Sequence, residues 1–389
     1  MKPITKIIVL LVIVLSIVVC IAKVYWLLIS SLSFSIILIS TYYSKHIRNR
    51  IITKILYFFS ILLVFLVAIA IRVFIVEIYA ISSSSMKNTI LPKDRVLVNK
   101  LSYGPVLPQS PFEIPWINAF YYLNSSNHNK VDSTWWKSRH FKGYSNIRHH
   151  DIIVFKLLRN DNQTYIKRCI AIPGDTLLIK ESKVFINSIK QEYSENILNS
   201  YKLYTSSAIR LQMDLDKMGI YYQKQRNETD RNVYFILVSE DVNGKLRDLP
   251  YVDSTKRCNT YRKIDFLSIF SEDFDWSIDN FGPIIIPGKG DKISLNHSNH
   301  IKYKELLRNL EKACIEKKEH HYQVNGKIQT DYTFQNNYFF VMGDNRYQSI
   351  DSRFFGLIKE DMIIGKSERV LFSTYDDRFQ WKRIYKRIQ

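Results

Sequence analysis

Four consecutive serines, Ser82 to Ser85, follow a long apolar stretch in the run "SSSSMKNTI". A serine hydroxyl is a weak nucleophile until a neighbouring base takes its proton, so a catalytic serine requires such a base elsewhere in the chain. A polar linker below a membrane helix would have the same composition and would do no chemistry. A suitable base would distinguish these two interpretations.

Two kinds of base are available. Histidine is the usual one, but the sequence has no GxSxG elbow, and "HHD" (149–151) and "HSNH" (297–300) lack a known metal-ligand spacing. We therefore expect surface histidines, no metal and no cofactor. The alternative is a lysine whose pKa burial lowers by several units from ~10.4. Lys167, in the strand-like run "TYIKRCIAIPGD", is the best candidate.

Strand alternation places Lys167 and Arg168 on opposite faces, so that one contacts a wall of the protein and the other contacts water. A lysine in a strand is usually solvated, so Lys167 alone is weak support for catalysis. Ser84 and Lys87 also fit the S-x-x-K motif of penicillin-recognising enzymes, but no KTG element is present. That class is a remote alternative. A membrane-anchored binding protein also remains open.

Three apolar runs precede the serines, at about 4–22, 24–43 and 55–76, and each is near the ~17 to 25 residues that span a bilayer. Basic residues cluster before the first run and before the third. The positive-inside rule places these clusters in the cytoplasm and everything beyond residue 77 outside it. A two-span arrangement, in which one of the first two runs does not cross, remains open.

Beyond residue 77 the sequence predicts a mainly β fold. Short runs rich in Val, Ile, Phe and Tyr alternate with Gly, Pro, Asn and Asp. We expect an antiparallel catalytic domain formed by 78–180 and 331–389, with a second, inserted β-rich domain at 181–330. Only 302–318 has helical spacing.

The chain of 389 residues has 55 Lys and Arg against 36 acidic residues, which gives a net charge of +19. The basic residues are scattered and no nucleic-acid motif is present, so nucleic acid is not an expected partner. The cysteines have no CxxC spacing, which makes a metal or thioredoxin-type site a poor interpretation. A disulfide among Cys169, Cys258 and Cys314 remains open.

Four stretches together resemble the bacterial type I signal peptidases (leader peptidases), in the long form with N-terminal transmembrane spans. They are the nucleophile segment at 71–104, "DIIVFK" at 151–156, "YIKRCIAIPGD" at 165–175 and "YFFVMGDNRYQSIDSRFFGLI" at 338–358. The chain departs from the family pattern at Ser82 and Ser84, where proline and glycine are common. An inactive homologue is therefore an alternative.

The resemblance implies a serine endopeptidase with Ser85 as the nucleophile and Lys167 as the general base. It implies that Ser83 donates to the oxyanion and that Ser349 hydrogen-bonds and orients the lysine. It also implies an ion pair of Asp351 with Arg353, and a structural turn that brings the last block near the lysine. The residues of that turn are Gly343, Asp344, Asn345 and Arg346.

The same resemblance implies the substrates and the location. Substrates would be exported preproteins with small residues at the first and third positions before the cut. The enzyme would be a multi-pass protein of the cytoplasmic membrane, in contact with the lipid bilayer, with its catalytic domain on the periplasmic side. The export translocon is a further candidate partner.

Overall fold

The structure is a computed structural model that describes residues 49–114, 139–157, 163–191, 197–225, 232–258, 274, 276–318 and 321–388. The first two expected membrane spans, about 4–22 and 24–43, lie outside these residues. Antiparallel strands dominate the described part of the chain, which confirms the mainly β prediction.

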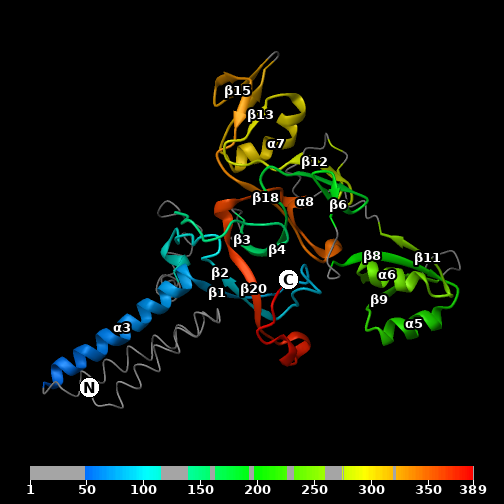
Figure 1. Cartoon of the computed structure of the whole chain (residues 1–389), viewed down its shortest axis with the longest axis horizontal. Helices are drawn as coiled ribbons and strands as arrows, with labels where there is room; N and C mark the ends of the chain where they lie inside the picture. The colour runs from blue at the N-terminus through cyan, green and yellow to red at the C-terminus, as the bar shows by residue number, and fades with distance from the viewer. Residues whose placement is uncertain are drawn as a thin grey trace, which may run out of the picture.

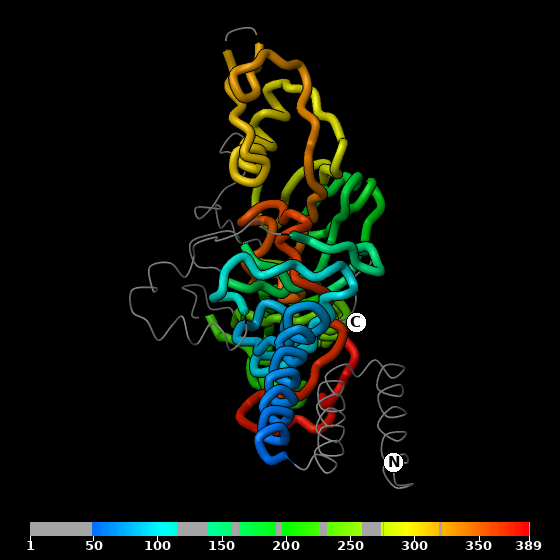
Figure 2. The backbone as a smooth tube through the Cα atoms, turned by 90° about the vertical axis from the view of Figure 1, so that its left-hand side faces the viewer, coloured from blue at the N-terminus to red at the C-terminus, as the bar shows by residue number. Residues whose placement is uncertain are grey.

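Helix α3 (Arg50–Phe74) is the one helix among the described residues that is long and apolar enough to cross a membrane. Its mean hydropathy reaches 2.6, and Asn49 caps its start by accepting a hydrogen bond from the Ile51 amide at 2.9 Å. Large side chains such as Phe58 and Ile61 are 64% and 68% exposed. A helix that is apolar all round suits lipid. It projects away from the sheets in Figure 1, and in Figure 2, which views the molecule from that side, it lies in front of them.

The main sheet combines strands from both ends of the described chain. Its seven strands run in the order β1-β2-β20-β3-β4-β18-β19, and all neighbours are antiparallel. β20 is inserted between β2 and β3, so Asp94 has Ser373 as its Cα partner. The bounds are β1 (Val76–Ala80), β2 (Asp94–Asn99), β3 (Ile152–Lys156), β4 (Thr164–Ala171), β18 (Tyr338–Met342), β19 (Ile358–Lys359) and β20 (Ile363–Ser373).

A second sheet and a small lobe cover one end of the main sheet (Figure 1). The second sheet has the order β12-β5-β6-β7 and the lobe contains two short sheets and helix α7. Their elements are β5 (Thr176–Lys180), β6 (Lys183–Ile186), β7 (Ile189–Lys190), β12 (Phe281–Ile285), β13 (Lys292–Ser294), α7 (His297–Asn309), β14 (Ile315–Lys317), β15 (Tyr322–Val324), β16 (Lys327–Gln329) and β17 (Asp331–Thr333).

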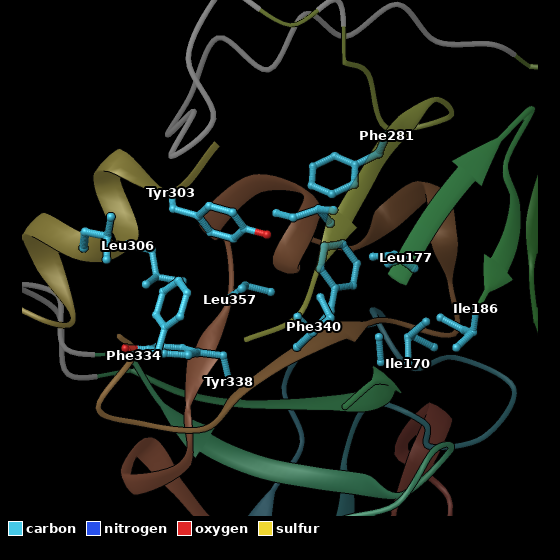
Figure 3. Close-up of a cluster of buried hydrophobic side chains, with 14 of the residues drawn as sticks. Ile170, Leu177, Ile186, Phe281, Tyr303, Leu306, Phe334, Tyr338, Phe340 and Leu357 are labelled. Atoms are coloured by element: carbon cyan, nitrogen blue, oxygen red, sulfur yellow. The ribbon is translucent and has the colours of Figure 1, made fainter. Parts of the chain in front are cut away.

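One apolar core joins these parts. Figure 3 shows Phe281 of the second sheet, Phe340 of the main sheet and Tyr303 of α7 pointing into the same buried cluster. Tyr303 also donates from its hydroxyl to the Ile285 carbonyl at 2.8 Å. The core therefore fixes the second sheet and α7 against the back of β18, the strand that leads into residues 343–346.

The helix expected at 302–318 lies earlier in the chain. Asn296 caps it by accepting from the Asn299 amide at 2.9 Å, and helix α7 ends at Asn309. Lys312 then adopts a positive φ of 56°, and β14 pairs with β15. The apolar residues near 313–315 thus continue the helical spacing in sequence but belong to a turn and a strand.

The remaining sheet belongs to a separate βαββαβ unit, residues 199–257. Its strand order β11-β8-β10-β9, with all neighbours antiparallel, is that of ferredoxin-like folds. The sequence predicted strands here but missed both helices. The elements are β8 (Asn199–Thr205), α5 (Ala208–Lys217), β9 (Tyr222–Gln225), β10 (Asn232–Val238), α6 (Glu240–Arg247) and β11 (Val252–Arg257).

Short helical turns complete the fold. α8 (Ser352–Phe355) and η3 (Arg346–Gln348) follow β18, and η4 (Glu360–Met362) precedes β20. η1 (Pro111–Glu113) follows β2 in the chain, and the C-terminal tail contains η5 (Tyr375–Asp377) and η6 (Trp381–Arg383). Cys169, Cys258 and Cys314 are all free thiols, so no disulfide joins these three residues.

Candidate active site

The serine run occupies a turn that follows β1, and apolar anchors hold it against the main sheet. Met86 and Ile90 are fully buried in a cluster that includes Ile166 of β4. The Ile90 amide donates to the Met86 carbonyl at 2.8 Å, which closes the turn. Because Met86 is anchored, the preceding residue Ser85 is held next to β4 and is only 6% exposed.

Lys167 lies on β4 opposite Ile153 of β3 and is 3% exposed. Its Nζ donates to Ser85 Oγ at 2.7 Å and to the Ile166 carbonyl at 3.0 Å. The Tyr165 ring centroid is 5.9 Å from the same nitrogen. Lys167 thus has neutral partners only, and no carboxylate among the described residues forms an ion pair with it.

Burial is the main influence on this amine. Loss of hydration disfavours the charged form and lowers the pKa of Lys167 to about 8, while the carboxylates of Asp351 and Asp344 raise it only in part. An amine with such a pKa is neutral in about a tenth of the molecules at pH 7, far more than an ordinary lysine. It can therefore accept a proton from a hydroxyl 2.7 Å away.

Arg168 does not face water as strand alternation predicted. It is 4% exposed and forms a two-pronged pair with Asp344, Nε to Oδ1 at 2.8 Å and Nη2 to Oδ2 at 2.7 Å. Asp344 also accepts from the Thr89 hydroxyl. The far face of β4 is covered by the segment after β18, so both faces of the strand are buried. Asp344 thereby links β4, the strand of Lys167, to the serine turn.

The turn at 343–346 contacts the backbone of the serine run. The Asn345 amide donates to the Ser85 carbonyl at 3.0 Å, and its side-chain nitrogen donates to the Ser84 carbonyl at 3.2 Å. A Cβ at Gly343 would lie 2.5 Å from the Ser85 carbonyl oxygen and 2.3 Å from Ser349 Oγ. Only glycine allows this close approach.

Asp351 and Arg353 form a second buried ion pair behind this turn. Arg353 Nε donates to Asp351 Oδ1 at 2.8 Å, and Nη2 donates to the Arg346 carbonyl at 2.7 Å. Asp351 also accepts from the Gly343 amide at 3.1 Å. Burial alone would raise the pKa of Asp351, but the Arg353 guanidinium, together with the hydrogen bond from the Gly343 amide, holds that pKa below its usual value.

The two other serines expected at the site differ in their contacts. Ser83 is exposed, and its Oγ lies 3.3 Å from Ser85 Oγ. Ser349 is 4% exposed and lies across Gly343 from the Ser85 carbonyl, but its hydroxyl makes no hydrogen bond to Lys167. It is close enough to Asp351 to help lower the pKa of that carboxylate, although the geometry is not that of a normal hydrogen bond.

Sequence reasoning missed Thr89 and the carbonyl of Ile166. Thr89, four residues after Ser85, is buried, and its hydroxyl donates to Asp344. Its position inside an apolar turn, between Met86 and Ile90, is the signal that a buried hydroxyl needs a partner. The Ile166 carbonyl gives no sequence signal, because any residue supplies it.

The histidine clusters do not form a metal site within the described ranges, where no group of three or more His, Cys, Asp or Glu side chains converges. His149 instead contacts Asp175 at 2.6 Å, and the His150 carbonyl accepts from Arg168 Nη1 at 3.0 Å. These two residues therefore support the loop before β3.

Known proteins resemble this chain over most of its length. The family described as signal peptidase, peptidase S26, matches residues 51–255 and 284–372. Signal peptidase I of Buchnera aphidicola subsp. Baizongia pistaciae is 26% identical over 359 residues, which is 91% of this chain and 86% of that protein. The same enzyme of B. aphidicola subsp. Schizaphis graminum is 25% identical and covers 82% of this chain and 74% of its own length.

A crystal structure of a signal peptidase I from Enterococcus faecalis V583 aligns with 57% of this chain and 97% of its own, at 16% identity and a TM-score of 0.22. That score is too low to support a statement about the fold. The family match covers well over half of the residues and includes both the serine turn and the lysine strand. The chain therefore belongs to the signal peptidase family, peptidase S26, and is a peptidase.

Proposed function

We propose that this chain removes signal peptides from exported preproteins with a Ser85–Lys167 dyad. The observation that carries the proposal is the 2.7 Å contact between Ser85 Oγ and a buried amine whose pKa is lowered to about 8. A buried lysine without a carboxylate partner is costly for stability. Its placement on a hydroxyl is best explained by proton transfer.

The mechanism proceeds in two halves. Neutral Lys167 accepts the Ser85 proton while Oγ attacks the scissile carbonyl, and the resulting ammonium protonates the leaving amine as the peptide bond breaks. The acyl-enzyme then reacts with a water molecule that gives its proton to the same amine. As the second tetrahedral intermediate collapses, its bond to Ser85 Oγ breaks, the lysine ammonium returns the proton to that oxygen, and the new carboxyl terminus leaves.

The negative oxygen of each tetrahedral intermediate needs donors. Ser83 Oγ, 3.3 Å from Ser85 Oγ, and the Ser85 amide are suited to this role, because within the described residues that amide donates to no other group. Ser349 acts as an orienting residue at a distance, through the crowded Gly343 backbone. This role replaces the direct hydrogen bond to the lysine that the sequence predicted.

Five residues position the dyad: Asp344, Asn345, Arg346, Asp351 and Arg353. Asp344 holds the strand of Lys167 through Arg168, and Asn345 holds the Ser85 carbonyl. Asp351 and Arg353 keep residues 343–346 in place through the Gly343 amide and the Arg346 carbonyl. The division into a catalytic domain, 78–180 with 331–389, and an inserted region, 181–330, is part of the same proposal.

Helix α3 is proposed to anchor the enzyme in the cytoplasmic membrane, as one span of a multi-pass protein. Ser85 is only the eleventh residue after Phe74, and an extended residue covers at most ~3.6 Å, so the nucleophile stays close to the bilayer. We place the catalytic domain on the periplasmic side, where the cut site of a preprotein emerges near the translocon. Substrates carry small residues at the first and third positions before the cut.

A cleavage assay with matched variants tests the dyad. Ser85→Ala and Lys167→Ala, each purified in detergent, are expected to lose at least about 10³-fold in kcat/KM on a model preprotein. Ser82→Ala, an exposed neighbour in the same run, serves as the control and should cleave normally. Circular dichroism checks that the variants fold. Retained cleavage by either dyad variant would overturn the assignment.

A further inference from the structure

The βαββαβ unit has one sheet face that its helices do not cover. Both helices pack on the face formed by Tyr201, Leu203, Tyr234 and Ile236, together with Leu211 of α5. Successive strand residues alternate between faces, so the residues between these point the other way. The unit lies on the opposite side of the main sheet from α3 (Figure 1).

Two lysines face each other on this uncovered side. Lys202 of β8 and Lys256 of β11 are direct Cα partners in the sheet. Like charges in directly opposite positions destabilise a strand pair. Each ammonium instead leans onto an aromatic ring, Lys202 at 5.0 Å from the Phe235 centroid and Lys256 at 5.7 Å from the Tyr204 centroid.

The lysine pair has no acidic partner among the residues that the structure describes. Within the described part of the chain, neither ammonium forms an ion pair or hydrogen bond. The row across the sheet continues from Lys202 to Phe235 and Gln223, and the next row pairs Ser254 with Tyr204. The face thus presents two cations on an aromatic floor with neutral residues around them, a surface that complements an extended acidic chain.

The unit is fastened to the turn that holds the nucleophile. The Leu198 amide donates to the Asp344 carbonyl at 2.9 Å, and the Arg346 amide donates to the Leu198 carbonyl at 3.0 Å. Lys202 is four residues beyond Leu198 on an extended strand, so the two residues lie about 13 Å apart. A peptide that leaves Ser85 therefore needs only a short extended stretch to reach the lysine pair.

We propose that Lys202, Lys256, Tyr204 and Phe235 form a docking face for an acidic segment of the substrate, on the mature side of the cleaved bond. This inference rests on the proposed signal-peptide cleavage and names a substrate preference for it. An anionic lipid surface would meet the same lysines. We favour the peptide because the unit is bonded to the catalytic turn and lies across the main sheet from the membrane helix.

Two model preproteins test this inference on the full chain in detergent. They share one signal peptide and cut site and differ only in a short mature segment, acidic in one and glutamine- and asparagine-rich in the other. The wild type should show a kcat/KM about fivefold higher for the acidic substrate, mostly through a lower KM, and added salt should abolish the difference. The double variant Lys202→Gln/Lys256→Gln should lose this preference while cleaving the neutral substrate normally.

The matched control is Lys245→Gln/Lys327→Gln, which removes two exposed lysines from other surfaces and should keep the preference. Equal cleavage of both substrates by the wild type would overturn the docking face and leave the peptidase proposal intact. Failure to cleave either substrate would contradict the peptidase proposal itself. An effect of the lysine pair that requires anionic phospholipid in the micelles, and is equal for both substrates, would assign the face to lipid and overturn the inference.

Discussion

The main sheet and the βαββαβ unit present lysines in opposite ways. Lys167 is buried, and its partner Ser85 lies 82 residues away in sequence, while Arg168 and its partner Asp344 are separated by 176. The unit is assembled from one continuous stretch, 199–257, and its lysine pair lies at the surface. Holding a reactive amine without water requires walls from distant parts of the chain. Presenting charge to a partner requires only a local sheet.

The largest expected effect comes from breaking the buried contact that unites the distant segments. Asp344→Ala leaves the Arg168 guanidinium buried without its carboxylate, so we expect a loss of about 3–5 kcal/mol in the free energy of unfolding, together with loss of cleavage. Denaturant unfolding in detergent, followed by tryptophan fluorescence, measures the change. Asp253→Ala, an exposed carboxylate of the unit, is the control. A loss below about 1 kcal/mol would show that this pair does not hold the site.

A substitution in the core of the βαββαβ unit tests whether this unit folds independently of the main sheet. Leu211→Ala removes a fully buried side chain from the core under α5 and should destabilise the unit by about 2–5 kcal/mol. Limited proteolysis should then cut within 199–257, while a neutral model preprotein is still cleaved. Ile209→Ala, 73% exposed on the same helix, should change neither. Parallel loss of cleavage would mean that the two regions fold as one.

The smallest expected effect is the gradual change of kcat/KM with pH. With the pKa of Lys167 at about 8, the neutral amine becomes tenfold scarcer for each pH unit below that value. We expect kcat/KM to rise about tenfold from pH 6 to pH 7 and to level off above about pH 8. Initial rates on the neutral substrate measure this, with circular dichroism as a check on folding. A flat profile over this range would exclude Lys167 as the base.

The same amine affects stability with a definite sign. Its pKa is lower in the folded state than the ~10.4 of an unfolded lysine, so the unfolded chain holds more protons between about pH 8 and pH 10.4. Stability is therefore reduced by Lys167 below pH 8 and recovers as the pH rises through that window.

Sequence reasoning predicted the strands from local signals, and the family resemblance singled out Ser85 and Lys167, which the structure brings within 2.7 Å of each other. Lys167 lies in a run of apolar and aromatic residues, and Ser85 precedes Met86, the buried anchor of the turn. The burial of Arg168 was not predictable in this way. Alternation in a strand predicts the face on which a side chain lies. Whether that face is buried depends here on the segment that contains Asp344, far along the chain.

The helices of the unit were missed for a different reason. Ser239 caps α6 by accepting from the Val242 amide at 3.4 Å, and Glu240 and Asp241 follow in the first turn, so a start signal was present. The helix has only eight residues, and Asn243 and Gly244 within it are poor helix formers. Packing of Leu246 on the sheet stabilises it, and packing depends on strands that lie outside the helix itself.

The position of β20 has a consequence for biosynthesis. Ser85 lies in the turn between β1 and β2, and Lys167 lies on β4, which pairs with β3. β20, near the C-terminus, lies between β2 and β3 in the sheet and pairs with both. During translation the hydroxyl and the amine thus have no common scaffold until almost the whole polypeptide has left the ribosome. A chain that ends before β20 would keep Ser85 and Lys167 but would lack the strand that joins β2 to β3.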